Sequence, residues 1–399
     1  MGTTPPTRRR KILDSGTSLQ ISAAAVADSE DLLIEIFMCI PVKPLVRFKL
    51  VSQQWRSLIS DPKFIVNHAR RNPSLNALLL KSQSKEHPPL SIVPFEGYEI
   101  PRTPPLQFLN KPGIDILHSC KGFLCYSVVH DLLTSYYVCH SASGRSARIR
   151  VFDQESVKAL RSVCVAFDPL KSVHYKVIFV RQMSGSQMNR LIKIEIYSSE
   201  TRCWKSVKEI LIVPNNVEFE NEGVYWNGAV YWYEDTRLEV LYFDLELECF
   251  KKLPTPQVSE GSPKMNLEYF GESCGRLHLI TTRRSLRTQF TVYEMQRDKS
   301  DWIVKYQGDL NSMTLKYPKM VRGHIYRYYV YRPLCLIEGE KNEEPHLVIA
   351  IPGKVILYNL EDKGLKMLCD LLPAKSFCAH AISTNQFRTF QYMETLASI

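Results

Sequence analysis

A pair of short strand-forming elements recurs along this 399-residue chain from about residue 75 onward. The first element is a glycine turn followed by a short apolar strand, as in residues 228–232. The second is a strand that runs through a turn into a bulky residue, as in residues 194–204. Two hairpin-forming elements that repeat in this way are typical of the blades of a β-propeller. The second element recurs at intervals of 45, 51 and 65 residues, measured between Tyr197, Tyr242, Tyr293 and Tyr358.

The repeat can be counted from Leu78 to Leu371 and predicts about six blades, with five to seven allowed by the drift in its period. The chain also contains 20 Tyr, 17 Phe and 5 Trp, which suit the pleated surface of a sheet. We therefore predict the α+β class, with a small N-terminal helical bundle followed by an all-β domain. A β-propeller is the first interpretation of that domain, and an irregular β-sandwich is the alternative.

Residues 29–70 have a different pattern, which predicts three or four short helices. The first helix places Leu33, Ile36 and Phe37 on one apolar stripe, and Pro41 ends it because proline cannot continue a helix. A bundle of about 40 residues cannot bury this much apolar surface alone. We therefore expect a permanent helical partner for it.

The sequence of this bundle resembles the plant-type F-box. The resemblance is carried by residues 32–37 (LLIEIF), 41–49 (PVKPLVRFK), 51–59 (VSQQWRSLI) and 61–64 (DPKF). It implies binding to the Skp adaptor of a cullin–RING ubiquitin ligase. The sequence departs from the family pattern at Asp28 and Ser29, where a Leu-Pro pair usually opens the first helix.

The resemblance also assigns adaptor-binding residues. For Trp55 two roles stay open, packing inside the bundle or contact with the adaptor, and for the bundle itself the alternative is a structural cap without a partner. The residues assigned to the adaptor contact are Leu32, Leu33, Ile36, Pro41, Val42, Leu45, Val46, Phe48, Val51, Trp55, Leu58 and Ile59.

The β region resembles the F-box-associated region of the same plant proteins, a kelch-like β-propeller. The similar segments are residues 119–125 (SCKGFLC), 166–169 (AFDP) with 175–177 (YKV), and 197–200 (YSSE) with Trp204. This resemblance implies a substrate-recognition subunit of an SCF-type (Skp–cullin–F-box) ubiquitin ligase that selects an unknown protein substrate. The alternative is a free-standing propeller that binds a ligand or a glycan and has a structural helical head.

These patterns divide the chain into three parts. Residues 1–27 are rich in Thr, Ser, Pro and Ala and are predicted to be a disordered tail. Residues 28–71 are the predicted F-box. Residues 75–392 are the predicted recognition domain.

The densest group of possible metal ligands fits no paired metal-binding pattern, and we interpret it as core. Neither a glycine-rich phosphate loop nor a nucleophile elbow occurs in the sequence. We therefore predict no catalytic residue, no metal and no cofactor, and a non-catalytic subunit. The group of possible metal ligands that we interpret as core consists of His118, Cys120, Cys125, Cys139 and His140.

Composition limits the partners and the compartment. The net charge of +10 is spread along the chain, which favours a solvated basic surface over nucleic-acid binding. No run approaches about 18 apolar residues, so we expect no membrane span. The 11 scattered cysteines fit a reducing compartment, the cytoplasm or the nucleus. Residues 8–11 (RRRK) are either a nuclear import signal or a chance basic run.

Two loop segments that fit the repeat poorly, residues 283–288 and 321–332, are basic, and the second is rich in tyrosine. Arg and Tyr are enriched where protein interfaces carry most of their energy. One hypothesis is a shared surface for an acidic partner protein, and the alternative is two solvated loops on different sides of the domain. The predicted substrate-binding residues are Arg284, Arg287, Arg327 and Tyr329.

Overall fold

The structure, a computed structural model, describes Val26 and most of the chain from Ser29 to Ala397. The described ranges are 29–72, 75–82, 90–95, 106–131, 133–151, 159–183, 189–214, 223–234, 239–254, 256, 265–283, 286–323, 328–338, 344–371 and 387–397. The predicted tail, residues 1–27, lies outside them apart from Val26. In the described part of the chain, no helix has both the length and the apolar character needed to cross a bilayer.

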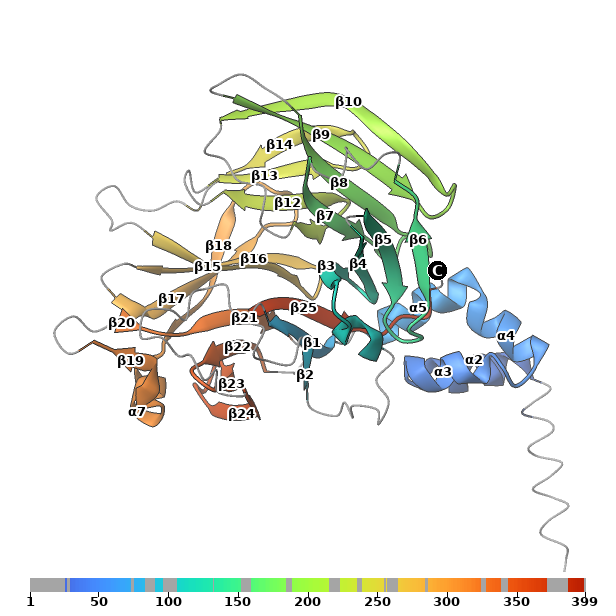
Figure 1. Ribbon diagram of the computed structural model, residues 1–399. Helices are drawn as coiled ribbons and strands as arrows, with labels where there is room; N and C mark the ends of the chain where they lie inside the picture. Colours follow the sequence, from blue (N-terminus) through green and yellow to red (C-terminus); the bar gives the residue numbers. More distant parts are fainter. Residues whose placement is uncertain are drawn as a thin grey trace, which may run out of the picture.

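Four short helices form the N-terminal unit, which we call the helical head (Figure 1). They are α2 (Glu30–Met38), α3 (Val42–Phe48), α4 (Gln53–Ser60) and α5 (Pro62–Arg71).

The boundaries of these helices follow from local chemistry. The Ser52 hydroxyl accepts a hydrogen bond of 3.1 Å from the backbone N–H of Trp55 and caps α4. Asp61 caps α5 by accepting from the N–H groups of Lys63 and Phe64 at 2.7 and 3.2 Å. Pro62 follows in the first turn, where its missing N–H costs nothing. The short helices are therefore separated by residues that favour helix ends.

Antiparallel sheets arranged around a common axis form a six-bladed β-propeller, which confirms the predicted fold class (Figure 1). The irregular β-sandwich is thereby excluded. Five of the blades have four described strands each. The first two consist of β3 (Ile114–Cys120), β4 (Phe123–His130), β5 (Leu133–His140) and β6 (Ser146–Ile149), and of β7 (Leu160–Ala166), β8 (Lys176–Met183), β9 (Asn189–Ser198) and β10 (Cys203–Pro214). The next three consist of β11 (Val224–Trp226), β12 (Ala229–Glu234), β13 (Glu239–Asp244) and β14 (Cys249–Leu253), of β15 (Met265–Ser273), β16 (Arg276–Arg283), β17 (Leu286–Met295) and β18 (Trp302–Asp309), and of β21 (Arg332–Ile337), β22 (His346–Ile351), β23 (Lys354–Asn359) and β24 (Leu365–Asp370).

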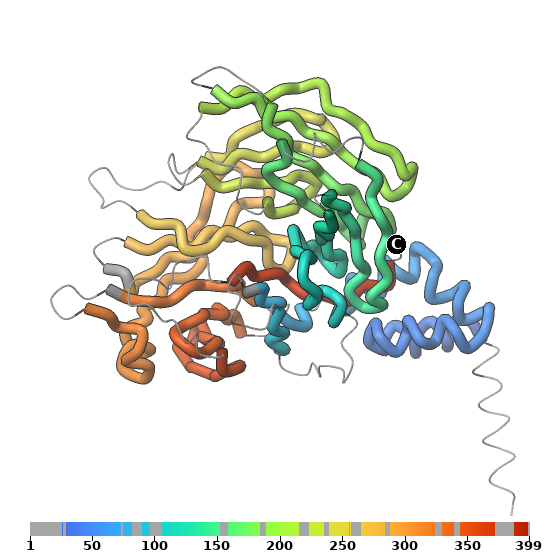
Figure 2. Tube along the Cα trace, viewed as in Figure 1, coloured from blue at the N-terminus to red at the C-terminus, as the bar shows by residue number. Residues whose placement is uncertain are grey.

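The sixth blade joins the two ends of the β region. It consists of β1 (Leu75–Ser82), β2 (Leu90–Pro94) and β25 (Phe387–Met393), with β1 in the middle. Leu79 pairs with Phe390 across the antiparallel ladder, and both side chains are buried. Figure 2 shows this C-terminal strand, in red, beside the blue strand that follows the helices. The ring is therefore closed by backbone hydrogen bonds between segments far apart in the sequence.

His118 ties three blades together near the axis. The backbone N–H of Val165 donates to its Nδ1 at 3.1 Å, so Nε2 carries the proton and donates to the Gly223 carbonyl at 2.6 Å. Burial lowers the pKa of His118 to about 4, so the ring is neutral near neutral pH. The ring is buried in the propeller.

The two ends of the propeller differ. The helical head lies at one end, where β25 finishes and β1 begins, and β19 (Val321–Arg322), β20 (Tyr328–Tyr329) and α7 (Asn311–Lys316) lie at the other (Figure 1). The tight turn at Lys121 and Gly122 is at the head end, because a Cβ on Gly122 would come within 2.5 Å of Thr395. The antiparallel strand order therefore places two turns of each four-stranded blade at this end, between its first and second strands and between its third and fourth, and the inter-blade connections at the other end.

Candidate functional site

The residues predicted to contact an adaptor divide into two groups by burial. One group lies inside the apolar core of the head, which also packs on Ala142 and Leu396 of the propeller. Leu45 and Ile59, for example, are both 0% exposed. In the chain alone, the head and the propeller already cover these side chains, so the assignment of this group to the adaptor contact stays a prediction. The group consists of Leu33, Val42, Leu45, Leu58 and Ile59.

The second group consists of side chains of the head that are exposed to solvent. Leu32 and Ile36 are 49% and 45% exposed and lie one turn apart on α2. Val51, in the turn between α3 and α4, is 62% exposed, and its neighbour Leu50 is 87% exposed. We call Leu32, Ile36, Leu50 and Val51 the apolar patch. Sequence reasoning missed Leu50, although an apolar residue outside both helical stripes and just before the Ser52 cap signals exposure.

The remaining predicted residues lie between these extremes. Pro41 is exposed, and Val46 and Phe48 are partly buried. Trp55 is also partly buried, with its ring centroid 5.0 Å from that of Phe37 and 5.4 Å from that of Phe48. The geometry is compatible with both roles predicted for Trp55, since the indole packs in the head and also reaches its surface.

Of the predicted substrate residues, Tyr329 lies at the end of the propeller away from the head. The structure describes Tyr329, in β20, as partly buried. Arg284, Arg327 and the side chain of Arg287 lie outside the described residues. Strand β17, which includes the backbone of Arg287, contacts β20.

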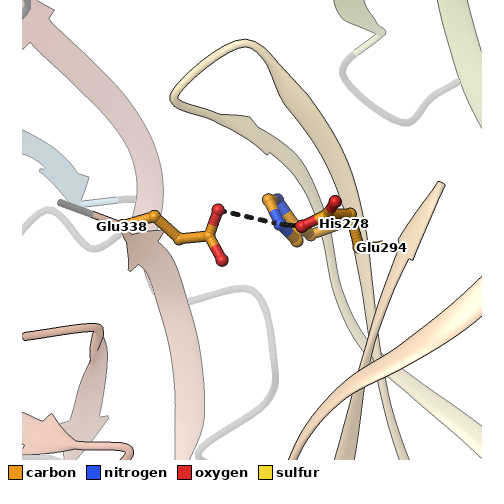
Figure 3. Close-up of side chains that lie close together, drawn as sticks. All are labelled: His278, Glu294 and Glu338. Carbon is orange, nitrogen blue, oxygen red and sulfur yellow. Dashed lines mark ion pairs between the residues drawn. The ribbon is translucent and has the colours of Figure 1, made fainter. Parts of the chain in front are cut away.

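A charged cluster joins two blades and was not predicted from the sequence (Figure 3). His278 of β16 is fully buried, and its Nε2 lies 3.6 Å from a carboxylate oxygen of Glu294 and 3.4 Å from one of Glu338. Glu294 is in β17 of the same blade, whereas Glu338 follows β21 of the next blade. Residues so far apart in sequence share no motif, so only the tertiary fold brings them together.

Cations surround this cluster. Lys305 Nζ lies 2.9 Å from Glu294 and 3.9 Å from Glu338, and Arg276 also pairs with Glu294. Burial opposes ionisation of Glu294, but hydrogen bonds from His278, Lys305 and Arg276 hold its pKa at about 2. Burial alone would lower the pKa of His278, but the two carboxylates raise it above its ordinary value.

His278, Glu294 and Glu338 are of the types that ligate metals, but their charges are already balanced. The two carboxylates face the two permanent cations Arg276 and Lys305, so a divalent ion would meet no net negative charge. The arrangement fits an ion-pair network between blades better than a metal centre.

The metal-ligand candidates from the sequence have other partners. His140 Nε2 donates to the Thr395 carbonyl, and Nδ1 accepts from the Ser143 hydroxyl, both at 2.8 Å. Burial raises the pKa of Cys120 to about 12 and that of Cys139 to about 11, and it also raises the pKa of Cys125. These thiols are therefore protonated near neutral pH and behave as small core residues.

Two protein families match the head and the propeller of this chain. The family described as an F-box domain matches residues 29–67, and the family described as an F-box associated beta propeller domain matches residues 99–342. The F-box protein At5g07610 of Arabidopsis thaliana is 31% identical over 404 residues, covering 95% of this chain and 94% of that protein. The F-box/kelch-repeat protein At3g23880 of the same plant is 25% identical over 308 residues, covering 71% of this chain and 76% of that protein.

This chain belongs to the plant F-box proteins that carry an F-box-associated β-propeller. Both resemblances drawn from the sequence are confirmed. An F-box implies an Skp-type adaptor as partner in general.

Proposed function

We propose that this protein is the substrate-recognition subunit of an SCF-type ubiquitin ligase. The head binds the Skp adaptor, and through it the cullin–RING ligase, while the propeller holds a target protein. No catalytic residue is needed, because holding the target beside the ligase raises its effective concentration. Such a subunit acts in the cytoplasm, the nucleus or both.

The apolar patch is the observation that carries this proposal. Its four side chains are between 45% and 87% exposed, on a head that the F-box family matches. Exposed apolar clusters on soluble domains mark interaction sites, and burying a Leu or Ile side chain is worth roughly 1.5–3 kcal/mol. Helical anchors one turn apart, as in Leu32 and Ile36, suit a partner with an apolar groove.

Co-purification tests the proposal. The full chain is co-expressed with the Skp adaptor, and the mass of the complex is measured by light scattering. We expect a 1:1 complex. If the folded chain elutes alone, the proposed function fails and the free-standing propeller becomes the better interpretation.

We further propose that the target binds at the propeller end away from the head, around the neighbouring strands β17 and β20. Arg284, Arg287, Arg327 and Tyr329 would give this surface a basic and aromatic character suited to an acidic partner. The test replaces the three arginines with glutamate and compares capture of an identified target at low salt. Unchanged capture by the folded triple variant would rule this surface out.

A further inference from the structure

Residues 394–397, which follow β25, lie between the head and the propeller, and we call them the clamp segment. Leu396 is 3% exposed and joins the same apolar cluster as Leu45 and Ile59 of the head. Ala142, from the turn after β5, and Val173, from the connection between β7 and β8, pack against this cluster from the propeller side. The core of the head is thus continuous with the propeller through the clamp segment.

Polar contacts hold the clamp segment to the head. Lys43 Nζ of α3 lies 2.9 Å from the Glu394 carboxylate, whose side chain is only 6% exposed. Lys49 Nζ donates to the Leu396 carbonyl at 3.5 Å. A pair this shielded from water is weakly screened by salt, and breaking it leaves a buried charge.

The propeller holds the other side of the segment. His140 donates to the Thr395 carbonyl at 2.8 Å, and the Glu394 N–H donates to the Asn76 side-chain oxygen at 3.0 Å. Gly122, with φ of 97°, leaves room for Thr395, because a Cβ there would come within 2.5 Å of its methyl group. The segment is therefore fixed on the propeller independently of its contacts with the head.

We propose that the clamp segment, together with Lys43, fixes the orientation of the head on the propeller. If the proposed function holds, this orientation sets where a captured target lies relative to the ligase, since tethering works only when the geometry allows simultaneous engagement. Lys43 and the clamp segment are then positioning residues that need not touch adaptor or target.

A distance measurement between the two units tests the clamp. Genetically encoded spin labels, which leave the cysteines untouched, are placed in the full chain at exposed Lys63 of the head and exposed Glu200 of the propeller. We expect one narrow distance distribution for the otherwise native chain. Lys43→Glu or Glu394→Lys alone should broaden it, and the double exchange, which restores opposite charges, should narrow it again.

A broad distribution in the native chain, or a narrow one in both single variants, would overturn the clamp. If a charge reversal prevents folding, Leu396→Ala gives the same readout through the apolar cluster, and an unchanged narrow distribution there counts equally against the proposal. The adaptor affinity of folded variants is measured in parallel and should stay at the native value, because Lys43 and Glu394 lie outside the apolar patch. If the native chain does not bind the adaptor, the proposed function is wrong. The distance distributions would still test whether the clamp segment fixes the head on the propeller.

Discussion

At the scale of single residues, two buried histidines respond to pH in opposite ways. His118 has its pKa lowered to about 4 by burial, whereas His278 has its pKa raised by Glu294 and Glu338 against the effect of burial. Folding therefore favours the neutral ring of His118 and the protonated ring of His278. The difference predicts separate pH windows for their contributions to stability.

For His118, the unfolded chain binds more protons than the folded chain between pH 6.5 and about 4. Its contribution to stability is therefore full above pH 6.5 and is lost as the pH falls towards 4. We predict that His118→Gln lowers the melting temperature near pH 7 and flattens its fall between pH 6.5 and 4. The check is a series of melting curves of both proteins, and equal slopes would contradict the neutral buried ring.

For His278, the folded pKa lies above the ordinary value of 6.5, so the protonated ring stabilises the fold fully below pH 6.5. That contribution is lost as the pH rises through the folded pKa. We predict that the free energy of unfolding of the native chain exceeds that of His278→Gln most at pH 6 and less at pH 9. A difference that grows with pH would show that the ring is not the bridging cation between Glu294 and Glu338.

At the scale of elements, local signals in the sequence were sufficient for the helices but only partly for the blades. Pro41, Ser52 and Asp61 mark helix ends through chemistry within a few residues. The repeat drifts to an interval of 65 residues between Tyr293 and Tyr358 because α7, β19 and β20 are inserted between two blades. The blade shared by both chain ends cannot appear as an ordinary repeat. The predicted boundaries between the tail, the F-box and the recognition domain, at residues 27, 28, 71, 75 and 392, stay predictions.

The candidate site could likewise be predicted from the sequence only in part. Apolar periodicity identified the helices of the head, but it did not say which stripe faces the propeller, since that depends on contacts with Ala142 and Leu396. Leu45 was therefore grouped with residues that the structure exposes. The charged cluster around His278 was missed for a related reason, because its members lie on different strands of two blades.

The burial of the head gives a paired prediction. Leu45→Ala should destabilise the head by about 2–5 kcal/mol, because it opens a cavity in a packed cluster. Ile36→Ala, at a position 45% exposed, should change stability by no more than about 0.5 kcal/mol. Denaturant unfolding of the full chain, followed by the helical circular dichroism signal, which comes mainly from the head, measures both. Equal effects of the two substitutions would contradict the assignment of inner and outer faces.

At the scale of the whole molecule, the propeller depends on a strand from the far end of the chain. Phe390 of β25 is 1% exposed and packs in one cluster with Leu79 and Leu124, which belong to two adjacent blades. We predict that Phe390→Ala costs about 3–5 kcal/mol and lowers the stability of the propeller as one cooperative unit. Unfolding monitored by circular dichroism tests this, and an early separate loss of one blade would contradict a closed ring.

The central claim is that the apolar patch of the head docks on an Skp-type adaptor. Calorimetric titration of the adaptor into the full chain measures this contact directly, using the native protein, the Ile36→Asp/Val51→Asp variant, and Leu247→Asp as a control at a propeller position that is 63% exposed. The account predicts equal affinity for the native protein and the control. It predicts at least a roughly tenfold loss for the patch variant, because a carboxylate buried without a partner costs more than about 1.4 kcal/mol. Native affinity in the folded patch variant, or no binding by the native chain, would contradict it.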